Sequence, residues 1–287
     1  MKMHTLGRTG ISVSRICLGT MTFGHQNTEA EGHQQMDMAA EHGVNFFDSA
    51  EMYPFPANPK TYGRTDEIVG TWLAARGQRD KIVVATKIAG PGARFEHIRG
   101  GSLKFDRTHL IQAVDDSLAR LRTDYIDLYQ THWPERPANY FGKLGYNHDA
   151  NAEWTPFEEM LDVMAEIEKA GKVRAFGISN ETPWGLMELM KLSESKGLPR
   201  MASIQNPYSL INRTFEVGLA EAAIRSVCGL LAYSPLGFGA LTGKYLDGAL
   251  PEGSRGALYP EFQRNFRPRG VEATARYVAL AREHGLD

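Results

Sequence analysis

The feature that most constrains the fold of this 287-residue chain is a strict alternation of short apolar segments with amphipathic helical ones. The apolar segments are rich in β-branched and aromatic residues and have the length of strands. They cover residues 16–20, 44–49, 82–87, 126–132, 175–179, 202–206 and 230–234. This alternation predicts a parallel sheet, because a parallel connection needs a crossover that is usually a helix.

The helical segments carry recognisable start and stop signals. The first begins with Thr28 and Glu31 in the spacing of a capping box and ends at Gly43. Two others begin with Thr155-Pro156 and Thr182-Pro183, which predicts a threonine N-cap followed by proline at the first helical position. Further helices are predicted at residues 66–76, 108–121, 214–227 and 271–283, and a hairpin at residues 4–15 that turns at residues 7–10.

A closed barrel fits this pattern better than a doubly wound sheet. Polar residues stand at many strand ends, and no glycine fingerprint follows the first strand. The sequence ends at Asp287, within or just after the seventh helix, so an eighth unit is missing. We therefore expect one α/β domain over residues 1–287, a (β/α)8 TIM barrel with an N-terminal β-hairpin, C-terminally incomplete. An open barrel would leave bare apolar edges on its first and seventh strands.

Composition argues against several classes of function. A net charge of −2 offers no attraction to nucleic acid or to an anionic membrane. No apolar run approaches the length of a membrane span, and the polar, glycine-rich N-terminus is not typical of a signal peptide. Cys17 and Cys228 have neither metal nor redox spacing, so we expect reduced thiols and a cytoplasmic protein.

Three successive strands end in an ionisable side chain. Asp48, Lys87 and His132 each stand last on the apolar face of a predicted strand, and Tyr53 follows in the loop after the first of them. Successive strands of a barrel are neighbours, so the four groups are expected to meet at one mouth. Singly, Asp48 could cap a turn, Lys87 could be a solvated charge and His132 an ordinary core histidine. Coincidence at three consecutive strand ends is the weaker explanation.

These residues resemble the catalytic tetrad of the aldo-keto reductase superfamily, including the five-residue step from Asp48 to Tyr53. The similarity extends through nearly the whole chain and is strongest to the Tas-like bacterial group. It is carried by LGTMTFG (residues 18–24), THWP (131–134), GISN (177–180), QNPYS (205–209) and AYSPLGFGALTGK (232–244). The resemblance implies an NADPH-dependent oxidoreductase that reduces small aldehydes or ketones to alcohols.

The resemblance also implies a role for each member of the tetrad. The hydride would come from nicotinamide, since no side chain can supply one. Tyr53 would donate the proton, with His132 as the alternative if its own pKa is raised. Lys87 would lower the pKa of the phenol, and Asp48 would keep the ammonium charged and in place. His132 would orient the carbonyl oxygen and donate a hydrogen bond to it.

A cofactor site at the strand ends is implied by the same resemblance. Ser179, Asn180 and Gln205 resemble the groups that bind the nicotinamide carboxamide, and Tyr233 resembles the aromatic side chain on which the ring stacks. The complete set is Gly19, Thr20, Met21, Asp48, Ser179, Asn180, Gln205, Tyr233, Ser234, Pro235, Leu236, Gly237, Leu241, Gly243 and Lys244. From Ser234 onward these residues match a pyrophosphate loop. Simpler alternatives are a helix cap for Asn180 and ordinary turns for the loop glycines.

The segment GFGALTGKY (residues 237–245) has neither the spacing of a Walker A loop nor the register of a Rossmann fingerprint. A barrel that binds NADPH without a Rossmann unit is consistent with both observations. In the family, the segment after the eighth strand reads the 2′-phosphate, so the preference for NADPH over NADH rests on the resemblance alone. The arginine-rich residues 254–269 either fold over the cofactor or form a solvated loop.

The two longest irregular stretches, residues 89–107 and 133–154, both follow strands, which in a barrel places them at the catalytic face. Their aromatic side chains predict either an apolar pocket that accepts aromatic groups or local aromatic clusters. These side chains are Trp133, Tyr140, Phe141, Tyr146 and Trp154.

Two other classes of function stay open. One is a nucleotide-binding regulatory barrel with little turnover, similar to the β subunits of potassium channels. The other is a metal-dependent hydrolase that uses His132, Asp48 and a further histidine such as His25, although Lys87 would repel a divalent ion. The leading interpretation expects no metal, and its partner is a small-molecule carbonyl substrate. The oligomeric state is left open, including a homo-oligomer.

Overall fold

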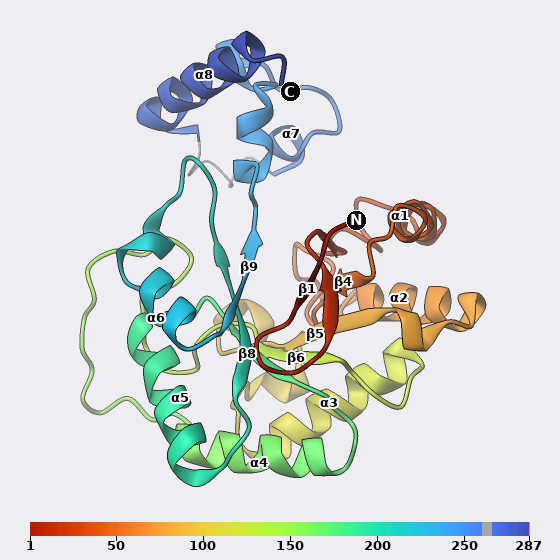
Figure 1. Cartoon of the computed structure of the whole chain (residues 1–287), viewed down its shortest axis with the longest axis vertical. Coiled ribbons are helices and arrows are strands. Elements are labelled where there is room, and N and C mark those ends of the chain that lie inside the picture. Colours follow the sequence, from red (N-terminus) through yellow and green to blue (C-terminus); the bar gives the residue numbers. More distant parts are fainter. Residues whose placement is uncertain (260–265, 287) are drawn as a thin grey trace. The chain divides into compact units, whose positions relative to one another are not determined.

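The computed structural model describes residues 1–259 and 266–286 (Figure 1). A small antiparallel hairpin precedes the main sheet, with β1 (Met3–Thr5) paired to β2 (Ser12–Ser14). The turn between them passes through Gly7 and Gly10, whose φ angles are 52° and 76°. The predicted N-terminal hairpin is therefore confirmed.

The main sheet has seven strands, and their order along the sheet is their order along the chain. They are β3 (Cys17–Gly19), β4 (Phe46–Asp48), β5 (Val83–Ile88), β6 (Leu128–Thr131), β7 (Phe176–Ser179), β8 (Met201–Pro207) and β9 (Gly229–Tyr233). Strands β3 to β7 pair in parallel. All seven predicted strands are present, and a sequential parallel order is that of the predicted α/β barrel.

Helices follow the strands as the periodicity predicts, apart from a four-residue helix near the C-terminus for which none was predicted. They are α1 (Glu29–Glu41), α2 (Arg64–Arg76), α3 (Arg107–Leu121), α4 (Phe157–Lys169), α5 (Pro183–Lys196), α6 (Leu219–Arg225), α7 (Arg255–Leu258) and α8 (Pro268–Glu283). The capping box of α1 is confirmed, with Thr28 and Glu31 bonding to each other's backbone N–H. Thr182 caps α5 as predicted and accepts a hydrogen bond from the N–H of Gly185.

Two helix predictions are wrong in detail. Thr155 does not cap α4, whose N-cap is Pro156. The backbone N–H and the hydroxyl of Thr155 both donate to Oε1 of Glu135 instead, over 2.9 and 3.2 Å. The helix predicted at residues 214–227 is divided into a short 3-10 helix, Thr214–Val217, and α6. Between them Gly218 has a φ of −159° and a ψ of −33°, which no helix continues through.

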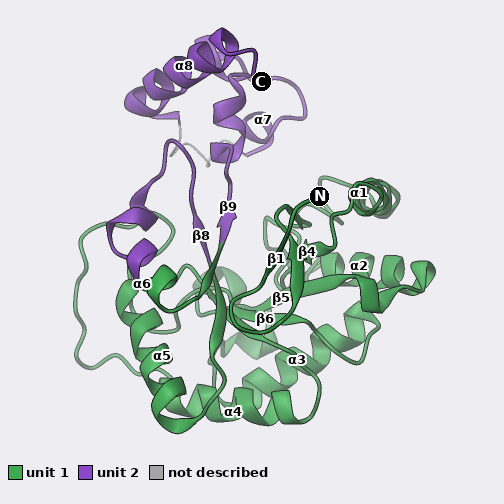
Figure 2. Ribbon diagram, in the orientation of Figure 1, with its two compact units in different colours: residues 1–204, 222–230 green, residues 205–221, 231–287 purple. Residues whose placement is uncertain are grey.

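The chain divides into two compact units, coloured separately in Figure 2. The first contains residues 1–204 and 222–230, and the second contains residues 205–221 and 231–287. Within the second unit, a Cβ added at Gly243 would lie 3.2 Å from Val278 of α8, so this helix packs closely on the loop after β9. The single domain expected over residues 1–287 stays a prediction.

Successive side chains of β4 and β5 point alternately toward the helices and away from them. Phe47 packs edge-on against Trp72 of α2, with ring centroids 5.2 Å apart. Thr86 of β5 donates to the buried carboxylate of Asp66, also on α2, over 3.1 Å. Because neighbouring side chains alternate, residues 46 and 48 of β4 and residues 85 and 87 of β5 lie on the opposite face. That face carries Asp48 and Lys87.

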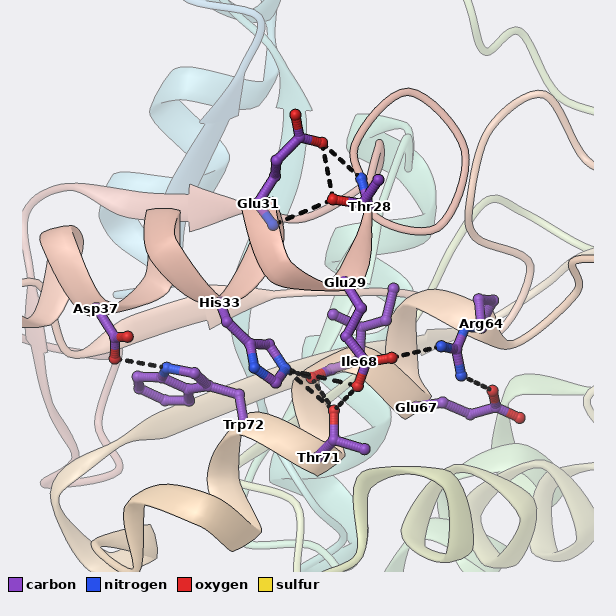
Figure 3. Close-up of polar contacts among 10 residues, drawn as sticks. All are labelled: Thr28, Glu29, Glu31, His33, Asp37, Arg64, Glu67, Ile68, Thr71 and Trp72. Carbon is purple, nitrogen blue, oxygen red and sulfur yellow. Dashed lines mark hydrogen bonds and ion pairs between the residues drawn. The ribbon is translucent and has the colours of Figure 1, made fainter.

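The helices that flank β4 are joined by polar contacts (Figure 3). Arg64 of α2 donates to Glu29 of α1 over 2.5 Å, and the indole N–H of Trp72 donates to Asp37 over 2.9 Å. The imidazole Nε2 of His33 lies 3.2 Å from a backbone carbonyl of α2. Since α1 precedes β4 and α2 follows it, these contacts position both ends of the segment that contains Asp48 and Tyr53.

We expect Gly70→Ala to destabilise the protein, because α2 and α3 approach closely at this glycine. A Cβ there would lie 2.2 Å from the carbonyl oxygen of Arg120 and 2.8 Å from the Cα of Leu121. Overpacking of this kind costs about 1–3 kcal/mol of unfolding free energy. The matched control is Ala74→Gly at an exposed position of the same helix. Glycine has the lower helix propensity, so this variant should lose about 1 kcal/mol of unfolding free energy. Urea unfolding measures both, and equal stability of Gly70→Ala and the native protein would contradict the close approach.

Candidate active site

The register of the parallel strands brings polar side chains together at their carboxyl ends. Asp48 of β4 pairs with Ala85 of β5, and Lys87 pairs with Gln130 of β6. The ammonium of Lys87 lies 2.5 Å from Oδ2 of Asp48 and 2.7 Å from the carbonyl of Ser49. The amide Nε2 of Gln130 donates to Oδ1 of Asp48 over 3.0 Å. One carboxylate thus links side chains from three adjacent strands.

Tyr53 and His132 complete the group. The phenol oxygen of Tyr53 lies 3.5 Å from Nε2 of His132, and the two rings meet edge-on with centroids 5.4 Å apart. The ammonium of Lys87 lies 5.1 Å from the centroid of the Tyr53 ring, within the range of a cation–π contact. Asp48, Lys87, Tyr53 and His132 therefore form a continuous chain of contacts, with exposed fractions between 0 and 9%.

Burial and charge move the pKa values of Lys87 and His132 in opposite directions. Burial lowers the pKa of Lys87, but the carboxylate of Asp48 and the phenol of Tyr53 together raise it above its usual value. For His132, burial and the nearby Lys87 both lower the pKa well below its usual range. Lys87 is therefore an ammonium and His132 a neutral imidazole near neutral pH. A lowered pKa of His132 favours Tyr53 over His132 as the proton donor.

The lowered pKa of His132 predicts that stability falls in mild acid. The unfolded chain takes up a proton near pH 6.5, whereas the folded chain resists it, so this stability is present above that pH. It is lost as the pH falls from about 6.5 toward the lower folded-state pKa. We expect His132→Gln to remove about one proton from the uptake that accompanies unfolding. Urea unfolding at pH 5 and pH 7.5 measures this, and the exposed His4→Gln is the control. An unchanged pH dependence in His132→Gln would contradict a neutral, buried imidazole.

Gln130 also belongs to the site, through its bond to Asp48, although it was not among the predicted site residues. It lies on the same face of its strand as His132, but an amide does not ionise and so attracted no attention. Its Oε1 is buried without a hydrogen-bond partner among the described residues, and so is Nδ1 of His132. Buried polar atoms of this kind are costly, which makes them candidates for bonds to a bound molecule.

Several residues of the implied cofactor set lie in the same unit as these four. Thr20, just after β3, donates from its hydroxyl to the carbonyl of Asp48 over 2.9 Å. The amide Nδ2 of Asn180 donates to the carbonyl of His132 over 2.9 Å and to Oγ of Ser179 over 3.1 Å. Asn180 has a left-handed backbone, with a φ of 54°. The alternative role of Asn180 as a helix cap is wrong, since Thr182 caps α5.

Gly19 ends β3 beside Asp48, and Met21 packs against the apolar cluster around Tyr53. The rest of the implied set belongs to the second unit. Gln205 lies in β8, Tyr233 ends β9, and the loop that follows runs through the 3-10 helix Gly237–Thr242. Positive φ angles at three glycines of this loop, between 58° and 91°, agree with the simpler explanation that they serve turns. Of the arginine-rich segment 254–269, for which a flap over the cofactor and a solvated loop both stay open, residues 260–265 lie outside the described residues.

An apolar cluster surrounds the Tyr53 ring. Its buried members include Met52, Ile98, Leu103 and Trp133, with Phe95 and Tyr140 packed against them. The five loop aromatics fall into separate groups of packed rings, and an apolar pocket that accepts aromatic substrates stays a prediction. Trp133, Tyr140 and Phe141 form one connected group beside Tyr53. Tyr146 contacts only His148 among the ring contacts of the described residues, and Trp154 packs on Phe157 and Trp184.

The described residues contain neither a cluster of metal-ligating side chains nor a helix suited to crossing a membrane. In residues 1–259 and 266–286, no group of three or more His, Cys, Asp or Glu side chains is placed to hold a metal ion. Within the same ranges, none of the helices combines the length and the apolar character that crossing a membrane requires.

The sequence is similar to a known protein family and to several individual proteins. The model of the aldo/keto reductase family matches residues 15–287. Protein tas of Escherichia coli K12 is 49% identical over 287 residues, which cover 100% of this chain and 83% of that protein. The uncharacterized oxidoreductase YrpG of Bacillus subtilis is 37% identical over 251 residues, covering 86% and 70%. The chloroplastic pyridoxal reductase of Arabidopsis thaliana is 28% identical over 276 residues, covering 90% and 66%.

Proposed function

We propose, from the premise that this chain belongs to the aldo/keto reductase family, that it reduces the carbonyl group of small aldehydes or ketones to an alcohol with NADPH. Membership makes the protein an oxidoreductase of the (β/α)8 barrel class. The observation that carries the finer proposal is the chain of contacts through Asp48, Lys87, Tyr53 and His132.

Carbonyl reduction adds a hydride to carbon and a proton to oxygen. A phenol is a weak acid, and it gives up its proton more readily when a positive charge stabilises its anion. This role for Lys87 is supported by its ammonium, which lies 5.1 Å from the centroid of the Tyr53 ring and 2.5 Å from the carboxylate of Asp48. The neutral imidazole of His132 can donate a hydrogen bond to the carbonyl oxygen as negative charge develops there. Tyr53 is therefore proposed as the proton donor and His132 as the group that orients the substrate.

The residues present suit a nicotinamide cofactor, which would supply the hydride. Its carboxamide group both donates and accepts hydrogen bonds. Ser179 and Asn180, at the end of β7, offer a hydroxyl and an amide beside the backbone of His132. The unpartnered Oε1 of Gln130 is a further buried acceptor at these strand ends. We propose that Ser179 and Asn180 hold the carboxamide. The cofactor contacts that the resemblance implies for Gln205, Tyr233 and the loop through Lys244, all in the second unit, stay a prediction.

The proposal is tested first by nucleotide titration and then by turnover. Tryptophan fluorescence of the native protein is titrated with NADPH and with NADH, and we expect saturable binding that is tighter for NADPH. Turnover is then measured on a panel of aldehydes and ketones that includes an activated benzaldehyde and pyridoxal. With nicotinamide deuterated at C4, the label should appear on the carbinol carbon of the product. Nucleotide binding without reduction of any member of the panel would reject the enzyme in favour of a regulatory barrel.

A further inference from the structure

We infer that a buried ion pair outside the tetrad, Glu51 with Arg99, holds Tyr53 and Lys87 at their working separation, an inference that rests on the proposed function. The exposed fractions of the two side chains are 0% for Glu51 and 1% for Arg99. Nη1 of Arg99 donates to Oε2 of Glu51. Glu51 and Arg99 are therefore positioning residues, which we call the clamp.

Glu51 binds the end of β5 at two points. Its backbone N–H donates to the carbonyl of Lys87 over 3.1 Å. Its side-chain Oε1 accepts from the N–H of Ala89 over 2.5 Å. Glu51 lies three residues after Asp48 and two before Tyr53. It therefore joins the segment that carries the phenol to the strand that carries the ammonium.

Arg99 completes the clamp from the long loop after β5. Its Nη2 donates to the carbonyl of Ala89 over 3.3 Å, so this residue is held through its N–H by Glu51 and through its C=O by Arg99. Arg99 has a φ of 43°, and Gly100 and Gly101 follow it at 69° and 87°. A left-handed backbone is unfavourable for a residue with a long side chain and persists where surrounding contacts hold it. The guanidinium of Arg99 makes such contacts with Glu51 and with the carbonyl of Ala89.

Both charges of the clamp are needed. Burial raises the pKa of Glu51, and the charge of Arg99 opposes this effect. Without Arg99 the carboxyl group is driven toward its neutral form, and without Glu51 a guanidinium charge is buried with one carbonyl as its partner. Removing either partner is expected to displace the segment. Replacing both by uncharged side chains removes the clamp and leaves no buried charge behind.

The ionisation of the Tyr53 phenol reports the position of Lys87. Among the described residues, Lys87 and His132 lie beside the phenol, while Asp48 and Cys17 act on Lys87. If the ammonium moves away, the phenolate loses its positive neighbour and the phenol titrates at a higher pH. This shift is read without turnover, so it is measured whether or not the protein reduces carbonyls.

The experiment compares the native protein with Glu51→Gln, Arg99→Lys and the double variant Glu51→Gln/Arg99→Met. Ionisation of Tyr53 is measured for each as an ultraviolet difference titration against the same protein carrying Tyr53→Phe. We expect Glu51→Gln and the double variant to titrate at higher pH and to lose about 10²-fold in kcat, with KM little changed. Arg99→Lys keeps the charge and is expected to retain much of both properties.

Glu166→Gln is the control, since it breaks an ion pair with Arg107 in which both side chains are more than half exposed. Neither the titration nor kcat should change in this variant. The double variant guards against misfolding, because it leaves no unpaired charge in the interior. If its Tyr53 titrates as in the native protein while the fold is intact, the clamp is refuted. Failure of the native protein to reduce any carbonyl refutes the proposed function instead, and the titration still decides on the clamp.

Discussion

Tyr53→Phe is expected to lower the rate of carbonyl reduction by about 10²- to 10⁴-fold, which is the usual contribution of a positioned proton donor. Phenylalanine keeps the ring, its edge contact with His132 and its place in the apolar cluster, and removes only the hydroxyl. The affinity for NADPH should stay close to that of the native protein. Single-turnover kinetics with saturating NADPH, together with fluorescence titration, measure the two effects separately.

Tyr129→Phe is the matched control for this substitution. Tyr129 is a fully buried tyrosine of β6, and its hydroxyl makes no hydrogen bond among the described residues. Removing an unbonded buried hydroxyl should leave turnover unchanged and stability equal or slightly higher. If Tyr53→Phe reduces an activated aldehyde at a rate comparable to that of Tyr129→Phe, Tyr53 is not the proton donor.

Lys87→Met is expected to have the second largest effect, because it alters both stability and chemistry. The ammonium is fully buried and bonds Asp48 and the carbonyl of Ser49. Removing one partner of a buried ion pair costs about 3–5 kcal/mol of unfolding free energy. Turnover should fall by about 10²-fold or more, since the phenolate of Tyr53 is no longer stabilised by a positive charge.

The double variant Asp48→Asn/Lys87→Met separates the two effects. With neither charge present, no ion is left buried without its counter-ion, so most of the lost stability should return in urea unfolding. Turnover should not return, because the charge beside Tyr53 is still missing. A double variant that recovers turnover together with stability would show that Lys87 acts only by supporting the fold.

Local sequence signals predicted the secondary structure well, and one of their two failures has a clear physical cause. Thr155-Pro156 and Thr182-Pro183 carry the same signal for the start of a helix. Thr182 caps α5, whereas Thr155 bonds to Glu135, a residue 20 positions earlier in the chain. A threonine side chain can bond to a competing partner instead of the helix N-terminus. When that partner comes from a distant segment, the local sequence pattern does not predict the bond.

The polar strand ends were predictable for a simple reason. Side chains alternate along a strand and successive strands of a barrel are neighbours, so Asp48, Lys87 and His132 had to approach one another. Glu51 was not singled out, although it lies between Asp48 and Tyr53 in the sequence. Its partner Arg99 is 48 residues further along, in an irregular loop. The periodic patterns that predict strands and helices do not predict a contact of this kind.

The sequence by itself determined the strands, their order and the residue types that meet at their ends, because these follow from periodicity and from the rule that consecutive parallel strands lie side by side. Only the tertiary structure decided which groups pair and in which direction each pKa moves. Lys87 and His132 stand in similar places on adjacent strands, yet the carboxylate of Asp48 raises the pKa of one while burial and the ammonium lower that of the other. Desolvation and charge act through space over a few ångströms, and those distances exist only once the chain has folded.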